Sequence, residues 1–162
     1  MLLYLLRHGD AIEQGYDDVS RPLSPPGEEH AANAANAFIS MNLSLDLILS
    51  SPLLRAKRTA EIIGNAINVT ECMTTEYLVP QTSERELLRQ LNECGRNSVL
   101  LVGHEPHLRA FVSLLIAGTR HANIAVKKGV LLALETSTPV QAGSGVLKWM
   151  LTSEQMKRLR TE

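Results

Sequence analysis

The sequence predicts an α/β protein, a three-layer α/β/α sandwich with a mostly parallel central sheet. Short apolar runs recur along the 162 residues, and stretches with helix-start signatures separate them. Runs this short fit fully buried strands, whereas helices need more length. Strands that alternate with helices through most of a chain favour parallel pairing, with helices on both faces of the sheet.

The elements are expected in a regular order. Ser24 is the expected cap of the first helix, and either Thr82 or Ser83 caps the third. The last two strands are expected as antiparallel additions, and a short helix ends the chain. Strands are expected over residues 2–6, 46–50, 69–73, 98–102, 129–134 and 145–151, and the longer helices over about 25–41, 53–67, 84–94 and 106–117.

Composition and charge indicate an ordinary globular protein. With 44% hydrophobic and 20% charged residues, the chain can bury a substantial core, and we expect a single domain over residues 1–162. A net charge of −1 implies no broad cationic surface, so we expect no nucleic-acid partner. The first apolar run is too short for a membrane helix and lacks a basic leader, so we expect a cytoplasmic protein with no membrane partner. Cys72 and Cys94 lack the spacing of a zinc site or a disulfide framework.

Arg7, His8 and Gly9 follow the first apolar run directly. The carboxyl ends of strands in open α/β sheets are where ligands bind. A neutral imidazole is a nucleophile, a guanidinium binds anions, and a glycine lets the backbone approach a bound group or take a positive φ. The motif therefore indicates a histidine that attacks a phosphoryl group held by arginine. The alternative is a strand-end histidine that only caps backbone groups.

Two further residues point to the same anion site. Arg55 falls in the first turn of the helix at 53–67, where free N–H groups and the helix dipole favour anions. A basic residue there is unfavourable for the helix itself, which favours a functional role. Lys57 and Arg58 have a plainer interpretation as a solvated basic patch. His104 follows Gly103 at the end of the fourth strand, and we expect it to face the crevice that holds His8.

Other charged residues near these motifs allow two interpretations. Arg21 is either a contact on the substrate side or the partner of Asp17 or Asp18 in a salt bridge. The pair Lys127 and Lys128 either lies near the anion crevice or forms a plain basic turn.

The three remaining histidines receive no role. We expect His30 on the surface of the first helix, and His121 in a loop. His107 is either solvent-facing or a contact at the rim of the site.

Together the motifs resemble those of the histidine phosphatase superfamily, also called the phosphoglycerate mutase-like family. Residues 7–9 match its signature, residues 51–59 resemble its second motif, and Gly103-His104 matches its late glycine-histidine pair, all in family order. The short chain and its motifs resemble the SixA-type phosphohistidine phosphatases more than the mutases. The resemblance implies a phosphoglycerate mutase-like fold and no metal or organic cofactor. It also implies hydrolysis of phosphate carried on histidine of a signalling protein, such as a phosphotransfer domain, with inorganic phosphate as product.

The resemblance also implies roles for individual residues. His8 would attack phosphorus and become transiently phosphorylated, with its ring N–H oriented by a backbone carbonyl. Arg7, Arg55 and His104 would hold the phosphoryl oxygens, and His104 would be protonated or share a proton with the phosphate. Gly9 and Arg21 complete the expected substrate contacts.

The expected general acid is missing from its place in the sequence. Mutases and acid phosphatases of the superfamily carry a glutamate after the third strand, where this chain has Pro80. Imidazole leaves a phosphoramidate more easily than an alkoxide leaves an ester, so this loss favours phosphohistidine as the substrate. Glu76, Glu84 and Asp10 stay open as proton donors, although the plainer interpretation of each is an ordinary solvated carboxylate.

Two other functions stay open. One is a small-molecule phosphomonoesterase of the same superfamily, and the other is a non-catalytic module that binds phosphate in a regulatory role.

Overall fold

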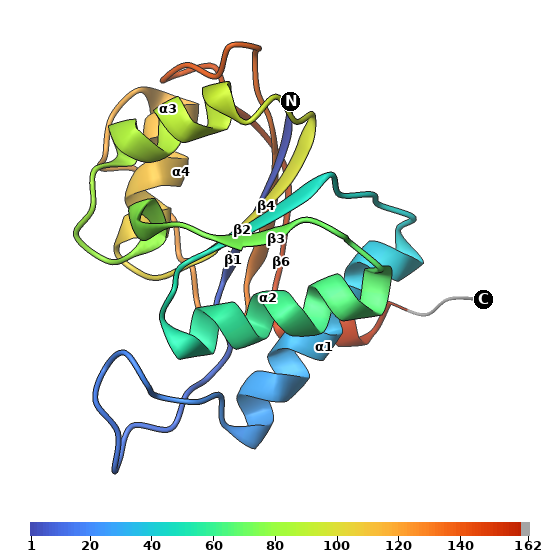
Figure 1. Cartoon of the computed structure of the whole chain (residues 1–162). Coiled ribbons are helices and arrows are strands. Elements are labelled where there is room, and N and C mark those ends of the chain that lie inside the picture. Colours follow the sequence, from blue (N-terminus) through green and yellow to red (C-terminus); the bar gives the residue numbers. More distant parts are fainter. Residues whose placement is uncertain (160–162) are drawn as a thin grey trace.

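The computed structural model describes residues 1–159 and places six strands in one sheet with helices on both faces (Figure 1). The predicted domain extends to residue 162, and its last three residues lie outside the described range. The strands are β1 (Leu2–Arg7), β2 (Leu47–Ser50), β3 (Cys72–Thr74), β4 (Ser98–Gly103), β5 (Leu131–Glu135) and β6 (Val146–Leu151). The helices are α1 (Pro25–Ser40), α2 (Leu54–Ile67), α3 (Glu84–Glu93), α4 (His107–Ala117) and α5 (Ser153–Lys157), with a 3₁₀ turn η1 (Glu76–Leu78).

The strand order β3-β2-β4-β1-β5-β6 places β1 and β4 at the centre of the sheet. Strands β1 to β4 pair in parallel with one another, which confirms the predicted parallel core of the sheet. Strand β5 runs antiparallel to β1 and β6 antiparallel to β5, as expected for the last two strands. In the register of β1 and β4, Arg7 lies opposite Gly103, so both strands end at the same edge.

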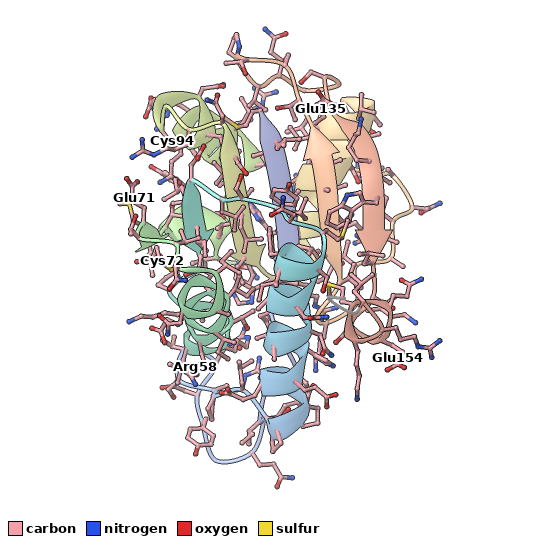
Figure 2. The ribbon with its side chains drawn as sticks, turned by 90° about the vertical axis from the view of Figure 1, so that its right-hand side faces the viewer. Arg58, Glu71, Cys72, Cys94, Glu135 and Glu154 are labelled. Atoms are coloured by element: carbon pink, nitrogen blue, oxygen red, sulfur yellow. The ribbon has the colours of Figure 1, made fainter. Side chains whose placement is uncertain are left out.

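Two apolar layers hold the helices against the sheet and confirm the three-layer sandwich. Side chains along β1 alternate between the two layers, with Leu3 and Leu5 on one face and Tyr4 and Leu6 on the other. Helices α3 and α4 cover the first face, and α1, α2 and α5 cover the second. Figure 2 shows α1 and α2 side by side over this second face.

The helix starts follow the predicted signatures. The Ser24 hydroxyl accepts a hydrogen bond from the Gly27 N–H at 3.2 Å, and Pro25 occupies the first turn of α1. Of the two candidate caps of α3, the structure uses Ser83, whose hydroxyl accepts from the Arg85 N–H at 3.3 Å.

The third strand begins later than predicted. Helix α2 ends at Asn68, which takes the left-handed conformation at φ 56°, and the Val69 N–H then donates to the Gly64 carbonyl at 3.0 Å. Residues 68 and 69 therefore terminate the helix, because both of their backbone N–H groups bond to the Gly64 carbonyl. Strand β3 is left with only three residues at the edge of the sheet.

Within residues 1–159, no helix is long and apolar enough to cross a membrane. The same part of the chain has no group of three or more histidine, cysteine, aspartate or glutamate side chains arranged to hold a metal ion.

Candidate active site

His8 and His104 leave the sheet from neighbouring strands at one edge. The backbone N–H of His8 donates to the Gly103 carbonyl at 3.1 Å, and this hydrogen bond joins the two strand ends. The two imidazole rings lie 4.8 Å apart between centroids, and only 6% of His8 and 2% of His104 is exposed. The predicted convergence of the two strand-end histidines is therefore present.

The hydrogen bonds of His8 fix which ring nitrogen carries the proton and which carries the lone pair. Its Nδ1 lies 2.6 Å from the Gly9 carbonyl oxygen, which can only accept, so Nδ1 carries the proton. The lone pair is then on Nε2, where it accepts a hydrogen bond from the Arg55 Nε–H at 3.3 Å. The pKa of His8 is lowered to about 4, mainly because the ring is buried. The hydrogen bond to the Gly9 carbonyl raises this pKa, and the positive charges of Arg55, Arg7 and Lys128 lower it. The imidazole is therefore neutral at neutral pH, as a nucleophile must be.

His104 faces the same space and is short of hydrogen-bond partners. Neither of its buried ring nitrogens has a partner within the described structure. Burial lowers the pKa of His104, and the nearby charges of His8, Arg55, His107 and Arg7 lower it further. A phosphate would supply an acceptor for an N–H here, and its negative charge would favour the protonated imidazole.

Arg55 reaches the site from the first turn of α2, as predicted. Its side chain is 4% exposed, and its guanidinium donates from Nη1 to the Asp18 carbonyl at 2.6 Å. Its Nη2 also lies 3.2 Å from the Asp18 carboxylate. Burial lowers the pKa of Arg55, while the charge of Asp18 opposes the shift. Asp18 therefore holds the guanidinium beside the Nε2 of His8.

Arg7 brings a second guanidinium to the same strand end. Its Nη1 donates to the Val126 carbonyl at 2.9 Å, whereas its buried Nε has no partner within residues 1–159. The turn after Val126 also contacts the site, because the Gly129 N–H lies 3.1 Å from the Arg7 carbonyl and 3.3 Å from that of His8. Lys128 pairs with Asp10 at 2.6 Å. Of the two interpretations of this turn, the position near the anion crevice is correct.

Gly9 is required by packing and not by backbone conformation. Its φ is not positive, and a Cβ on it would lie 2.3 Å from the Gly27 carbonyl oxygen. A Cβ on Gly27 would lie 1.9 Å from the Asp10 carbonyl oxygen, so the two glycines pack the active-site loop against the start of α1. The Gly9 N–H donates to the Thr59 hydroxyl at 3.3 Å. Of the two alternatives for Gly9, the structure therefore lacks the positive φ, and close approach to a bound substrate stays a prediction.

Arg21 takes the salt-bridge alternative. Its guanidinium lies 2.9 Å from the Asp18 carboxylate and 3.9 Å from that of Glu13. Arg21 thus belongs to the ion pairs that stabilise the loop beside Arg55. Its contact with substrate stays a prediction.

Thr59 and His30 also hold the loop, and the sequence analysis gave neither a role. Thr59 lies one helical turn after Arg55 and donates to the Arg55 carbonyl at 2.7 Å, so helical spacing could have placed it on the site face. His30 is half-buried, and its Nδ1 accepts from the Asp10 N–H at 3.3 Å. The expected surface position of His30 is wrong, because this helix face packs against the active-site loop and Gly129.

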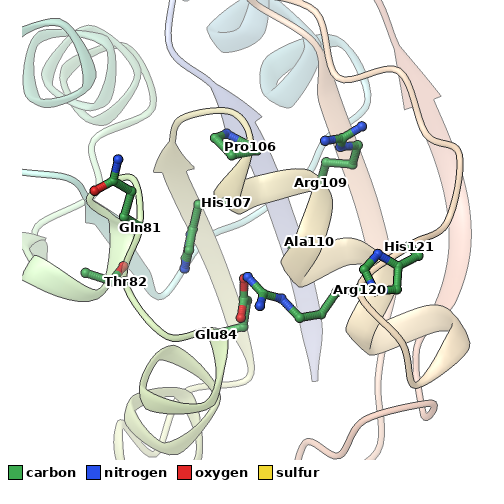
Figure 3. Close-up of a pocket in the computed structure, with 9 residues that line it drawn as sticks. All are labelled: Gln81, Thr82, Glu84, Pro106, His107, Arg109, Ala110, Arg120 and His121. Atoms are coloured by element: carbon green, nitrogen blue, oxygen red, sulfur yellow. The ribbon is translucent and has the colours of Figure 1, made fainter.

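His107 lines a separate pocket of about 290 Å³ (Figure 3). It is 2% exposed, and neither ring nitrogen has a partner in the described structure, so it is not solvent-facing. The neighbouring Glu84 carboxylate is buried and accepts a hydrogen bond from Arg120 at 2.8 Å. His121 lies exposed in the loop after α4, as expected.

The three candidate proton donors are held or exposed elsewhere. Asp10 accepts from Ser24 at 2.8 Å and pairs with Lys128, whose hydrogen bond is the main cause of its lowered pKa. Glu84 pairs with Arg120 in the separate pocket, and Glu76 is exposed on η1. None of the three is hydrogen-bonded to His8 or His104 in the described structure.

The fold and the site define an α/β protein with two imidazoles and two guanidiniums gathered at the carboxyl edge of its sheet. Comparison with known proteins agrees with this class. The family model of the histidine phosphatase superfamily (branch 1) matches residues 3–79, which include His8 and Arg55 and end before His104. An uncharacterized protein of Picosynechococcus sp. is 31% identical over 159 residues, which cover 94% of this chain and 96% of the relative.

The chain belongs to the histidine phosphatase superfamily, and it is a phosphatase. The phosphohistidine phosphatase SixA of Escherichia coli is 26% identical over 163 residues, which cover 97% of each chain. The structure of the protein histidine phosphatase SixA complexed with tungstate superimposes with a TM-score of 0.83 at 25% identity. The superposition covers 94% of this chain and 97% of the SixA chain.

Proposed function

We propose that this protein is a phosphohistidine phosphatase, which hydrolyses phosphate from histidine of a signalling phosphotransfer protein through a phosphohistidine intermediate on His8. The observation that carries the proposal is the state of His8. Its Nδ1 is held by the Gly9 carbonyl at 2.6 Å, so the lone pair lies on Nε2, where it accepts from the Arg55 Nε–H at 3.3 Å, with the His104 ring 4.8 Å from that of His8.

The surroundings of His8 suit a tetrahedral oxyanion. Arg7 and His104 keep buried nitrogens that no other described atom satisfies, and Arg55 lies beside Nε2. Such donors, already in place before the reaction, stabilise charge on the phosphoryl oxygens in the transition state. The similar SixA structure contains tungstate, which is also a tetrahedral oxyanion.

The positions of the carboxylates favour phosphohistidine over phosphate esters. An alkoxide leaving group needs a proton donor, and the three candidates Asp10, Glu76 and Glu84 are held by other partners or exposed. An imidazole leaving group needs less assistance. The positions of these carboxylates and the similarity to SixA support the same substrate class.

The reaction would proceed in two steps, transfer of the phosphoryl group to His8 and its hydrolysis. In the first, the Nε2 lone pair of His8 forms a bond to phosphorus, the P–N bond of the substrate breaks, and the substrate imidazole takes a proton from solvent. In the second, water attacks phosphorus, the bond to Nε2 breaks, and inorganic phosphate leaves with His8 restored. Arg7, Arg55 and His104 would hold the phosphoryl oxygens in both steps.

A substrate comparison tests the proposal. We expect kcat/KM to be highest for a histidine phosphotransfer domain phosphorylated on histidine, lower for free phosphohistidine, and lowest for p-nitrophenyl phosphate and sugar phosphates. His8→Gln is the inactive control, because glutamine provides no nucleophilic lone pair. A strong preference for the phosphate esters would instead identify a small-molecule phosphomonoesterase. Tight phosphate binding without any turnover would identify a regulatory module.

A further inference from the structure

Four exposed apolar side chains lie in the loop at residues 11–23 and at the start of α2, the two segments that carry Asp18 and Arg55. Tyr16 is 51% exposed and Val19 64%, and both belong to the loop at residues 11–23, which the Ala11–Leu23 bridge closes. Ile12 in the same loop is 38% exposed, and Leu54 at the start of α2 is 40% exposed. We call these four side chains the rim patch. Such side chains gain by being covered, because apolar surface in water is unfavourable.

Hydrogen bonds and an ion pair connect the loop that carries the rim patch to Arg55. The Leu54 N–H donates to the Val19 carbonyl at 3.0 Å, which joins the loop to the start of α2. Asp18, next to Val19, holds the Arg55 guanidinium through its carbonyl and its carboxylate. Figure 1 shows this loop in blue, projecting from the body of the protein beside the start of α2. A surface that covered the rim patch would therefore lie beside the segments that hold Arg55.

The charges of the loop restrict what can cover it. Its acidic residues Glu13, Asp17 and Asp18 outnumber its single base, Arg21, so the loop has a net charge of −2, or −1 when Arg55, which pairs with Asp18, is included. A membrane surface with anionic lipids would be repelled by these carboxylates. A second copy of the loop would bring like charges together. A protein surface with an apolar centre and lysine or arginine at its margin is complementary to both features.

We propose that the rim patch is the docking surface for the phosphorylated protein, and that this protein presents its phosphohistidine from an apolar patch bordered by basic residues. The inference rests on the proposed function and adds a second contact, outside the phosphate site, that only a protein substrate can make. Free phosphohistidine has the same leaving group and the same scissile bond, and it cannot reach the patch.

Paired variants test the docking surface. We compare Tyr16→Ser/Val19→Ser with Val146→Ser/Leu147→Ser, whose apolar side chains on β6 are 58% and 43% exposed. Val146 pairs with Glu135, and Glu135 with Leu2, so the control substitutions lie toward the edge of the sheet opposite the site. Each variant and the wild type are assayed with a histidine-phosphorylated phosphotransfer domain and with free phosphohistidine.

We expect kcat/KM of the loop variant for the phosphorylated domain to fall about tenfold, mainly because KM rises. This is the size of loss that follows removal of apolar contact residues from a protein interface. The kcat/KM of the loop variant for free phosphohistidine stays at the wild-type value, and the β6 variant matches the wild type on both substrates. Wild-type activity of the loop variant on the phosphorylated domain would overturn the docking surface. An equal loss on both substrates would also overturn it, because the loop would then act only through Arg55. A wild-type enzyme that turned over phosphate esters and neither phosphohistidine substrate would refute the proposed function itself, and docking with it.

Discussion

His104 and His107 lie three residues apart, are both 2% exposed, and both have ring nitrogens without partners in the described structure. Burial lowers the pKa of each. Their surroundings differ, since His104 lies 4.8 Å from the ring of His8 and near Arg55, whereas His107 lines a pocket with the ion pair of Glu84 and Arg120. Burial and missing partners therefore do not distinguish a catalytic histidine. What separates His104 from His107 is the gathering of His8, Arg7 and Arg55 around it, which is the basis of its proposed role.

Removal of the nucleophile should give the largest effect. We expect His8→Gln to lower kcat by at least about a thousandfold, because the remaining donors can orient phosphate and cannot form the covalent intermediate. Steady-state turnover of a phosphorylated phosphotransfer domain measures the loss, and circular dichroism shows whether the variant is folded. Residual activity within tenfold of the wild type would contradict the role of His8.

Matched substitutions of the two buried histidines test the comparison directly. We expect His104→Gln to lower kcat/KM by about a hundredfold to a thousandfold, the usual loss for one oxyanion donor. His107→Gln removes no donor from the phosphate site, so its kcat/KM should stay within about threefold of the wild type. Equal losses in the two variants would show that both histidines act on the phosphoryl group.

The pH dependence of folding gives a smaller effect that needs no substrate. An unfolded chain protonates histidine near its ordinary pKa of 6.5, whereas folded His8 accepts a proton only near pH 4. The unfolded state therefore binds more protons between these values, and the free energy of unfolding falls as the pH drops from 6.5 toward 4. Urea unfolding of the wild type and His8→Gln measures the difference. The variant should lose less stability over this interval, and identical slopes would refute the lowered pKa.

Thr59→Val should have the smallest effect on catalysis. It keeps the shape of the side chain and removes the hydroxyl that joins the Gly9 N–H to the Arg55 carbonyl. Because Thr59 positions the loop and does not contact phosphate, we expect a fall of a few-fold in kcat. Thr59→Ser keeps the hydroxyl and should restore most of the activity. A valine variant as impaired as His104→Gln would place Thr59 among the phosphate contacts.

The fold and the central residues of the site could be predicted because they depend on local patterns. Apolar runs that end in Arg7-His8 and Gly103-His104 place both histidines at one edge as soon as the strands are taken as parallel neighbours. The N-cap of α1 at Ser24 follows from the residues around it.

Other features depend on contacts between distant segments. His30 reaches Asp10 only because Gly27 packs against the active-site loop, and His107 is buried only because α3 and α4 meet. The spacing of residues along the chain carries no signal for such contacts. The start of β3 was also missed, because Asn68 and Val69 terminate α2 before the strand can begin.

The most direct measurement of the central claim is rapid quenching of the enzyme after mixing with a phosphotransfer domain that carries ³²P on histidine. We predict a transient label on this protein that is stable in alkali, is lost in acid, and maps to the peptide containing His8. The label should be absent from His8→Gln. A label that survives acid, or turnover by an enzyme that never becomes labelled, would contradict the covalent role of His8.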